Sequence, residues 1–579
     1  MRAPTALRIV RRTAAVPPVS LSAGLHPVLQ RIYAARGIVS AAQLGLNLRE
    51  LLPVGSLAAV EAAAELLALH QQRGGLLLVI GDFDADGATS TALIVRALRS
   101  WGFPAVDFLV PNRFEFGYGL TPEIVALAAE RRPALIVTVD NGISSNAGVE
   151  AARARGIDVL ITDHHLPGAC LPAANVIVNP NVPGSTFASR ALAGVGVAFY
   201  VMAALRRLLA ARGWLPPRAL QCAELLDLVA LGTVADVVPF DSNNRILVAQ
   251  GLSRIRAGRC APGISALLEL ARRERSGVVA GDLGFAVAPR LNAAGRLTDM
   301  SIGIRCLLSD EPAEARALAL ELDALNTERR SIEARMQAEA HAALRSLRDP
   351  DSGMRRAGVC LFDPGWHQGV VGLVASRVKE RLRRPVIAFA PADAGTLRGS
   401  ARSIPGIHIR DVLDAIAARD GTLIHKFGGH AMAAGLTLPM ASLDVFARAF
   451  DAECETALRL RGSPDLIETD GELSDAELAL PTAQALREGG PWGPGFPEPS
   501  FDGRFRIESA RVVGERHLKL WLSAPEGRGR FDAIAFNYLD ADQAASLPCG
   551  VVQLVYRLDI NEYLGERRLQ FVIEHLLPA

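Results

Sequence analysis

Short apolar runs alternate with longer segments of mixed character from residue 76 to about residue 180. Four of these runs are rich in β-branched residues, as strands covered on both faces are; they span residues 76–80, 134–139, 158–162 and 175–178. Such alternation is typical of βαβ units that build a parallel sheet. Helices are expected to follow over residues 191–212 and 222–232.

The second half of the chain repeats this pattern and then changes character. Residues 311–347 are rich in Ala, Leu, Glu and Arg and contain no glycine, which predicts one or two long helices. Strand-like runs return at 358–362 and 386–389 and indicate a second α/β domain that continues to about residue 459. After a Pro/Gly-rich passage at 489–499, short alternating runs such as 505–509 and 518–522 predict a small β-barrel.

A chain of 579 residues is too long for a single hydrophobic core. We therefore expect an α/β protein with two parallel-sheet domains joined by a long helix, followed by a C-terminal β-barrel. The expected boundaries are 1–65 for an N-terminal segment packing on the core, 66–255 for the first α/β domain, 256–355 for a helical connector with the long helix, 356–460 for the second α/β domain and 461–579 for the barrel.

The composition indicates where the protein is located but does not identify a binding partner. No window holds about 18 uninterrupted apolar residues, and the first twenty residues lack the apolar core of a signal peptide, so we expect no membrane span and a cytoplasmic location. The seven Cys form no Cys-x-x-Cys pair, which argues against disulfides and against a thiolate zinc site. Because the net charge is only +1, any site for a polyanion must be a local patch.

Three of the predicted strands run directly into acidic residues. Ligands of open parallel sheets bind at the carboxyl ends of strands, so these acids should converge on one crevice. A fourth acid follows a later hydrophobic segment. The residues concerned are Asp82, Asp84 and Asp86, then Asp140, then Asp163 with His164 and His165, and finally Asp236.

A plainer interpretation is that these acids only serve turns and helix caps, which Asp favours in any protein. That interpretation suits one Asp better than four separate segments. Two carboxylates about 4 Å apart repel by roughly 4 kcal/mol at an effective dielectric of 20, and five or six would share this site. A cation must compensate. An oxygen-rich set with imidazoles and no thiolate suits two divalent ions, Mn²⁺ or Mg²⁺, which together promote in-line attack of water on phosphorus.

The four segments resemble, in order and approximate spacing, the motifs of the DHH phosphoesterase superfamily. The matching stretches are Asp84-Ala-Asp86-Gly, Asp140-Asn-Gly, Asp163-His-His and Asp236. The resemblance implies Asp84, Asp86, Asp140, His164 and Asp236 as metal ligands, with Asp140 bridging two ions and His165 touching the scissile phosphate. Many relatives have a His where Ile80 stands here, and Asp82 is expected to substitute as a ligand. We assign Asp163 to orienting the two histidines.

The second half of the chain narrows the family. Residues 426–435, with Gly428, Gly429 and His430, resemble the signature of the DHHA1 substrate-binding domain, and Ser400 and Arg402 lie in the same region. Backbone amides of glycine-rich turns together with an arginine can hold phosphates. Stretches around Arg113, residues 289–296 with Arg290 and Arg296, residues 326–330 and residues 25–33 are similar to the bacterial RecJ exonucleases. The predicted barrel resembles an oligonucleotide-binding (OB) fold.

This resemblance implies a single-stranded-DNA-specific, metal-dependent 5′ to 3′ exodeoxyribonuclease that releases mononucleotides in DNA recombination and repair. Single-stranded DNA would pass between the two α/β domains, and Arg113, Ser400 and Arg402 would hold its 5′ end. A monomer is expected, with the single-stranded-DNA-binding protein and a RecQ-type helicase as partners.

Two alternatives stay open. The first is a phosphoesterase of the same superfamily that acts on short oligonucleotides, phosphoadenosine phosphate or cyclic dinucleotides; the barrel and the long helix argue against it, because such enzymes need only the two α/β domains. The second is a DNA-binding scaffold without catalysis. The presence of all the main ligands argues against that one.

Overall fold

The computed structural model of the chain describes residues 8–13, 24–111, 119–346, 356–392, 395–461, 466–514, 517–524, 529–538, 547–563 and 566–578. The chain divides into two compact units. The first unit comprises Met1–Pro289, Met300–Ala319 and Pro464–Ala579, and the second comprises Arg290–Asp299 and Leu320–Ser463.

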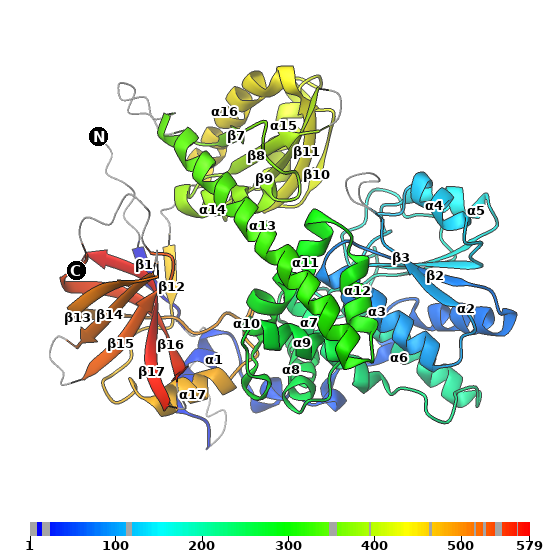
Figure 1. Cartoon of the computed structure of the whole chain (residues 1–579), viewed down its shortest axis with the longest axis horizontal. Helices are drawn as coiled ribbons and strands as arrows, with labels where there is room; N and C mark the ends of the chain where they lie inside the picture. Colours follow the sequence, from blue (N-terminus) through cyan, green and yellow to red (C-terminus); the bar gives the residue numbers. More distant parts are fainter. Residues whose placement is uncertain are drawn as a thin grey trace. The chain divides into compact units, whose positions relative to one another are not determined.

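A five-stranded parallel sheet lies within the first unit and is flanked by helices (Figure 1). Its order is β3 (Val106–Leu109), β2 (Leu77–Gly81), β4 (Leu135–Val139), β5 (Asp158–Thr162) and β6 (Val176–Val178). Four of these are the strands predicted from the apolar runs. The fifth, β3, has only four residues and is interrupted by Asp107, so the sequence pattern did not reveal it.

Helices cover both faces of this sheet, which is why its strands are almost entirely apolar. Helices α4 (Pro122–Ala129) and α5 (Asn146–Arg153) pack on one face. On the other side lie α2 (Val60–Arg73), α3 (Ala85–Ser100) and α6 (Gly194–Ala211), followed by α7 (Leu226–Ala235) and α8 (Ser242–Arg256) (Figure 1). The two helices expected after the last strand are thus confirmed as α6 and α7.

The strand register brings three strand ends to the same level. Gly81 ends β2, Val139 ends β4 and Thr162 ends β5. Gly81 pairs with Val139, and Val139 pairs with Thr162. β3 lies on one side of β2 and β4 lies on the other. The direction in which successive strands are added to the sheet therefore reverses between β2 and β4. Open α/β sheets bind ligands at such a switch point.

Helix α6 is the one described helix that is long and apolar enough to cross a membrane on its own. Of its 18-residue window, 67% is buried inside the structure, against helices α2, α3 and α7. Core helices of soluble proteins show the same combination, so α6 is accounted for by its packing in the domain.

The remainder of the first unit is mainly helical before the barrel. It contains α9 (Pro262–Leu270), α10 (Ala280–Asp282), a π-helical turn (Leu283–Val287) and α12 (Ser301–Leu308), while α11 (Ala288–Leu297) continues into the second unit. The predicted long helix is confirmed as α13 (Pro312–Ser346), whose residues belong partly to each unit. Short 3₁₀ turns lie at Ala41–Leu44, Leu48–Glu50, Val54–Ser56, Cys222–Leu225 and Arg275–Gly277.

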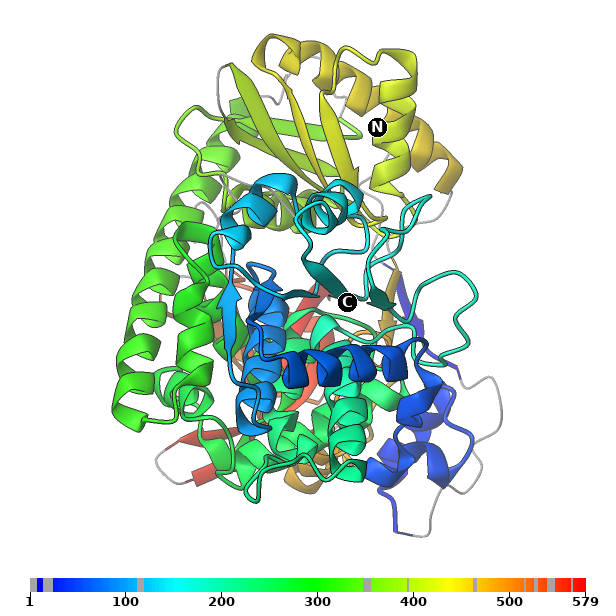
Figure 2. The same ribbon diagram turned by 90° about the vertical axis from the view of Figure 1, so that its right-hand side faces the viewer.

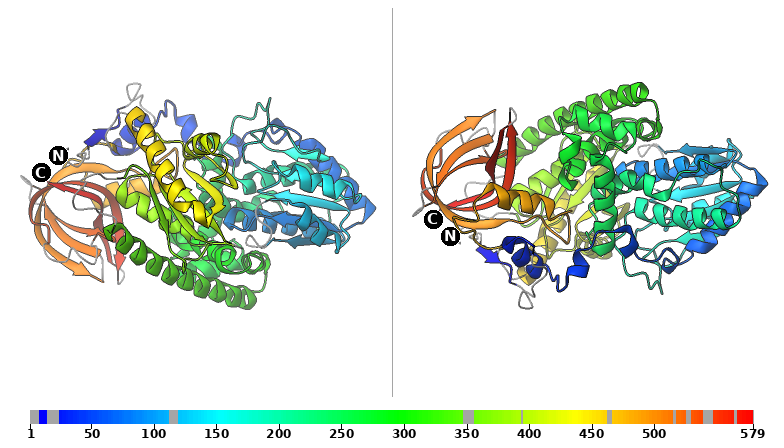
Figure 3. Two further views of the ribbon diagram at one scale, coloured as in Figure 1. Left: turned by 90° about the horizontal axis from the view of Figure 1, so that it is seen from above. Right: turned by 90° about the horizontal axis from the view of Figure 1, so that it is seen from below.

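The C-terminal strands form the predicted closed barrel (orange to red in Figure 3). Its order is β13 (Phe501–Val513), β14 (His517–Ser523), β15 (Arg530–Ala535), β17 (Glu566–Pro578) and β16 (Gly550–Tyr563). The N-terminal strand β1 (Arg8–Arg11) pairs with β12 (Leu466–Thr469) just before the barrel, beside α1 (Pro27–Ala35) and α17 (Leu480–Glu488). Arg36, which follows α1, donates two hydrogen bonds to the buried carboxylate of Asp470, which follows β12, at 2.7 and 3.0 Å.

The second unit is an α/β/α layer structure (yellow-green sheet in Figure 2). Its sheet has the order β10 (Lys426–Gly429), β11 (Ala433–Pro439), β9 (Thr396–Arg402), β8 (Val386–Pro391) and β7 (Val359–Phe362). Helix α14 (Val371–Leu382) and part of α13 pack on one face. Helices α15 (Ile409–Arg419) and α16 (Leu443–Arg461), with a 3₁₀ turn at Met440–Ser442, pack on the other.

The α/β class of this unit was predicted, but its sheet is mixed rather than wholly parallel. Only β7 and β8 pair in parallel; β8, β9, β11 and β10 are antiparallel neighbours. The physical reason is the short connection, because only residues 392–395 separate β8 from β9. A parallel crossover needs a dozen residues or more, so the chain returns as a hairpin.

Candidate metal centre

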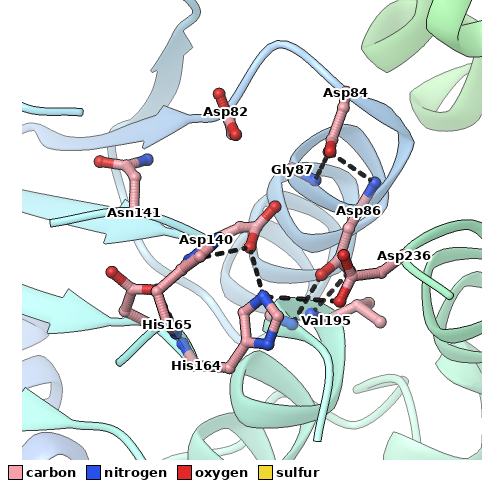
Figure 4. A network of polar contacts seen from close by, with 12 residues as sticks. Asp82, Asp84, Asp86, Gly87, Asp140, Asn141, His164, His165, Val195 and Asp236 are labelled. Atoms are coloured by element: carbon pink, nitrogen blue, oxygen red, sulfur yellow. Dashed lines mark hydrogen bonds and ion pairs between the residues drawn. The ribbon is translucent and has the colours of Figure 1, made fainter. Parts of the chain in front are cut away.

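The loop after β2 supplies the first acids of the cluster (Figure 4). Asp82 follows the strand directly, and Asp84 is the N-cap of α3, where its Oδ1 accepts hydrogen bonds from the amides of Asp86 and Gly87 at 2.9 and 3.0 Å. The ordinary capping role therefore applies to one oxygen of Asp84. The short loop and the cap together place three carboxylates within five residues at the end of a buried strand.

Asp140 sits at the end of β4 in a left-handed backbone conformation, with φ of +60°. Asp adopts this region more readily than most residues, but at a cost that the surroundings must offset. The buried Asn141 does so by donating from Nδ2 to the carbonyls of Val139 and Ile80, at 2.8 and 3.1 Å. This side chain ties the ends of β4 and β2 together, and so fixes Asp140 relative to the first loop.

Asp163 lies behind the two histidines. Its Oδ2 accepts the amide of Ile143 at 2.9 Å, and its Oδ1 accepts the amides of His164 and His165, at 2.7 and 3.0 Å. The same Oδ1 is 2.8 Å from Nδ1 of His165. Asp163 is thus occupied with holding the turn and the ring of His165.

His164 occupies the middle of the cluster. Its Nε2 lies 3.0 Å from Oδ1 of Asp140 and 3.5 Å from Oδ2 of Asp236, the residue that caps the C-terminus of α7 (Figure 4). On the far side, Asp86 is buried and accepts hydrogen bonds from the amides at the start of α6. Four separate segments of the chain therefore meet around one imidazole.

The possible ligand atoms fall into overlapping groups of three, each with its atoms within 4.8 Å of one another. The groups are Asp82, Asp84 and Asp140; Asp86, His164 and Asp236; and Asp140, His164 and His165. The first two share no residue, and the short contact between Asp140 and His164 joins them. Asp140 therefore lies where the groups meet.

The electrostatics of the cluster require a compensating cation. Burial and then the charge of Asp84 raise the pKa of Asp86 to about 7. Burial, together with the neighbouring carboxylates, raises the pKa of Asp140 and that of Asp236 well above the ordinary range. Without a cation, simultaneous ionisation of these acids is therefore disfavoured.

The His165–Asp163 pair behaves differently. Burial by itself would raise the pKa of Asp163, but the hydrogen bond and the charge of His165 lower it. In the same way, burial would lower the pKa of His165, but the hydrogen bond to Asp163 raises it above its usual value. The two groups therefore stabilise each other as an ion pair, while the acids around them repel one another.

The donor set fits hard or borderline divalent cations. Among the residues that the structure describes, carboxylate oxygens dominate the set, one or two imidazoles complete it and no thiolate takes part, as expected for Mn²⁺ or Mg²⁺. The raised pKa values point the same way, because a bound cation would allow the buried acids to ionise. The residues present thus suit the metal ions that the sequence analysis expected.

In the second unit, Ser400 and Arg402 lie together on β9, with Arg402 Nη1 donating to Ser400 Oγ at 2.9 Å. Both reach over the first turn of α14, because a Cβ built on Gly372 would lie 2.8 Å from Arg402 and 2.9 Å from Ser400. Ser400 on β9 pairs with Gly435 on β11, and Gly435 pairs with Gly428 on β10. Beside Ser400, the two neighbouring strands therefore carry no side chain at these paired positions.

The other predicted substrate residues are placed as follows. Arg290 Nε donates to Asp323 at 2.8 Å, and Arg296 donates to the carbonyl of Gly369 at 3.1 Å. Gly429 ends β10 with φ of +148°, and the exposed His430 follows it. The remaining one, Arg113, lies outside the described residues.

Three family models match the chain: the DHH family N-terminal domain at residues 77–233, the DHHA1 domain at 356–456 and the RecJ OB domain at 469–575. The single-stranded-DNA-specific exonuclease RecJ of Escherichia coli is 53% identical over 98% of this chain and 99% of that protein. The chain belongs to the RecJ family. The RecJ protein of Haemophilus influenzae is 47% identical over 97% of this chain and 98% of its own length.

Solved RecJ structures share this fold. RecJ from Thermus thermophilus, crystallised in complex with Mn²⁺, superposes with a TM-score of 0.79 at 32% identity and covers 99% of this chain and 80% of that one. Its Mg²⁺ complex gives a TM-score of 0.74 over 99% of this chain and 79% of that chain at 29% identity. The family, the fold class with its OB-type barrel and the domain types predicted from sequence are confirmed.

Sequence reasoning missed the groups that hold this RecJ-family cluster in place. The motif marks Asn141 but not its side-chain link between two strands. The amides of Gly194 and Val195, which donate to Asp86, lie in a segment without acidic or histidine residues. Backbone donors have no side-chain signature, and the only signal was a Gly-x-Gly pair at the start of a predicted helix.

Proposed function

We propose that this chain is an exonuclease specific for single-stranded DNA, which it degrades 5′ to 3′ to mononucleotides. The observation that carries the proposal is the meeting of five carboxylates and His164 at the level ends of three neighbouring strands, in a chain of the RecJ family. The curated RecJ relatives are named for single-stranded-DNA-specific exonuclease activity. Recombination and repair are the processes in which such an activity is needed.

Two divalent ions, Mn²⁺ or Mg²⁺, would be held by Asp82, Asp84 and Asp140 on one side and by Asp86, His164 and Asp236 on the other, with Asp140 shared. The ligand-atom groups support this division. When bound, such ions supply Lewis acidity and neutralise the charge that develops on phosphorus oxygens. The fixed turn of Asp140 and the tie through Asn141 keep the two halves of the cluster in place.

The histidine pair would divide its work. His164 belongs with the metal ligands, because its Nε2 faces Asp140 and Asp236. His165 would donate from Nε2 to the scissile phosphate, since its Nδ1 is engaged by Asp163. The hydrogen bond to Asp163 raises the pKa of His165, which favours a protonated, donating ring. Asp163 therefore acts as a positioning residue for His165.

The second unit would bind the DNA backbone. Ser400 and Arg402 offer a hydroxyl and a guanidinium at the first turn of α14, which suits a 5′-terminal phosphate. The paired glycines Gly435 and Gly428 would let a strand approach the sheet closely, with Gly429, His430, Arg290, Arg296 and Arg113 as further contacts. The barrel would add an OB-type surface for single-stranded DNA.

The decisive test is a nuclease assay with Mn²⁺ on a long 5′-phosphorylated single strand, labelled at either end, alongside a blunt duplex and phosphoadenosine phosphate. We expect mononucleotides from the 5′-labelled strand at once and progressive shortening of the 3′-labelled strand. Asp140→Asn should reduce the rate at least about a thousandfold, since metal catalysis supplies several kcal/mol. The control is Asp107→Asn, which alters only an exposed ion pair with Arg131.

The outcomes separate the alternatives. Turnover of phosphoadenosine phosphate without DNA degradation would identify a small-substrate phosphoesterase. Tight DNA binding without any cleavage would identify a scaffold, and mononucleotides released first from the 3′-labelled end would overturn the polarity.

The wider setting belongs to the same proposal. We place the protein in the cytoplasm as a monomer that works with the single-stranded-DNA-binding protein and a RecQ-type helicase, which would supply and unwind its substrate. The domain limits are proposed as 66–255 for the catalytic domain, 256–355 for the connector, 356–460 for the DHHA1 domain and 461–579 for the OB domain, with 1–65 packing on the core. The family-model matches fall inside three of these ranges.

A further inference from the structure

Two glycines from two different helices approach the carboxylates of the cluster unusually closely. A Cβ built on Gly194, the first residue of α6, would lie 2.7 Å from Cβ and 2.9 Å from Cγ and Oδ1 of Asp140. A Cβ built on Gly232 in α7 would overlap Thr89 Oγ1 and lie 2.8 Å from Oδ1 of Asp86. Non-bonded carbon and oxygen atoms do not approach this closely without strain. A side chain at Gly194 must therefore displace Asp140, and one at Gly232 must displace Thr89 together with the Asp86 carboxylate or Val195 beside it.

The start of α6 also holds Asp86 directly. The amide of Gly194 donates to Oδ2 at 2.6 Å, and the amide of Val195 donates to Oδ1 at 3.0 Å (Figure 4). Both oxygens of one carboxylate are thus oriented by one helix end, where the helix dipole also favours a negative charge. The N-cap residue Ala193 makes no side-chain cap, so Asp86 serves α6 as a cap from another part of the chain.

We propose that Gly194 and Gly232 are positioning residues of the metal centre: they let α6 and α7 close on Asp86 and Asp140 and so fix the spacing and orientation of these two ligands. The inference rests on the proposed function, because it assigns a role within that same centre. Groups that orient metal ligands without touching the ion commonly contribute 10-fold to 100-fold in affinity. The glycines act by the side chain they lack and, at Gly194, by the amide they place.

The test compares Gly194→Ala and Gly232→Ala with Gly196→Ala in the metal-free full-length protein. Gly196 lies in the same first turn of α6, but its added Cβ would come close only to Cδ2 of Leu192, at 2.9 Å, the end of a flexible side chain. All three replacements favour the helix by roughly 1 kcal/mol, so intrinsic helix propensity does not distinguish them.

Binding of Mn²⁺ is measured without DNA by electron paramagnetic resonance of the free ion, and thermal unfolding is recorded in EDTA. We expect Gly194→Ala and Gly232→Ala to weaken Mn²⁺ binding roughly 10-fold to 100-fold, with Gly196→Ala unchanged. Should Gly232→Ala fail to fold, the pair Gly232→Ala/Thr89→Ala removes the overlap with the hydroxyl and keeps the approach to Asp86. That variant should fold and retain the weakened binding.

Equal Mn²⁺ binding in the wild type, Gly194→Ala and Gly232→Ala would overturn the positioning role. So would an equal loss in all three variants, because it would trace the effect to a general disturbance of α6 and α7 rather than to the carboxylates. A wild-type protein that took up no Mn²⁺ would instead overturn the metal centre of the proposed function, and the two failures are therefore distinct.

Discussion

Replacing Asp236 by Asn should stabilise the metal-free protein while destroying its metal centre. Asp236 is half-buried beside Asp86 and His164, and it sits at the C-terminus of α7, where the helix dipole disfavours a negative charge. Asn has the same shape and no charge. The substitution therefore removes a repulsion that only a bound cation would otherwise offset.

The size of the effect follows from the geometry. Ligand atoms of Asp86 and Asp236 lie within 4.8 Å of each other, and two unit charges at that distance repel by about 3 kcal/mol at an effective dielectric of 20. Relief of the dipole adds about 0.3–1 kcal/mol. We expect the free energy of unfolding of the metal-free variant to exceed that of the wild type by about 3–4 kcal/mol at pH 8.

The gain should depend on pH in a defined direction. Burial and then the charges of Asp86 and Asp84 raise the pKa of Asp236 far above its unfolded value, so the folded protein keeps a proton that the unfolded chain releases. Wild-type stability is therefore lost as the pH rises from about 4 towards the folded pKa. The advantage of Asp236→Asn should be larger at pH 8 than at pH 5 and absent below about pH 4.

Calorimetry in EDTA at pH 8 and pH 5, repeated with saturating Mn²⁺ at pH 8, measures these differences. Asp107→Asn serves as the control, because it removes one charge from the surface of the same unit. Mn²⁺ should raise the unfolding temperature of the wild type and of the control, and should raise that of Asp236→Asn far less. A variant Asp236→Asn less stable than the wild type in EDTA at pH 8 would refute the repulsion at Asp236. Equal stabilisation of both proteins by Mn²⁺ would refute its role as a metal ligand.

Three further outcomes are expected. Asn141→Leu leaves two buried carbonyls without a donor and should cost about 1–3 kcal/mol in urea unfolding while weakening Mn²⁺ binding. Asp163→Asn removes the charge that raises the pKa of His165, so the alkaline limit of the pH–rate profile should move to lower pH; an unmoved limit would dissociate His165 from catalysis. Arg402→Lys should raise KM for 5′-phosphorylated single strands about 10-fold to 100-fold, with no such change for 5′-hydroxyl strands.

The sequence alone revealed the parts of the site that rest on strand ends. The carboxyl ends of neighbouring parallel strands lie on a common edge, so the acids after residues 81, 139 and 162 were expected to lie close together. In the structure, the strand residues just before these acids, Gly81, Val139 and Thr162, pair across the sheet. The mixed sheet of the second unit was beyond such reasoning, because buried strands look alike in either direction. The short strand β3 was hidden by Asp107 within its four residues.

The sequence pattern identifies the candidate ligands but not the groups that hold them in position. Asp86 is recognisable from its motif, but its two hydrogen bonds come from backbone amides more than 100 residues away in sequence. Those amides reach it only because Gly194 and Gly232 carry no side chain. Glycine is also common in turns and at helix starts, so its role here becomes visible only once α6 and α7 are placed against α3.

The same contacts explain why a cluster that opposes folding can persist. Asp86 and Asp140 repel their neighbours, yet Asp86 caps α6 and Asp140 is fixed by Asn141, so each is held by groups that stabilise the domain for other reasons. Relaxing the cluster would require α6 to lose its cap and β4 to lose its tie to β2. The repulsion is therefore retained in the folded state as a site already arranged for cations, and metal binding should stabilise the fold rather than reorganise it.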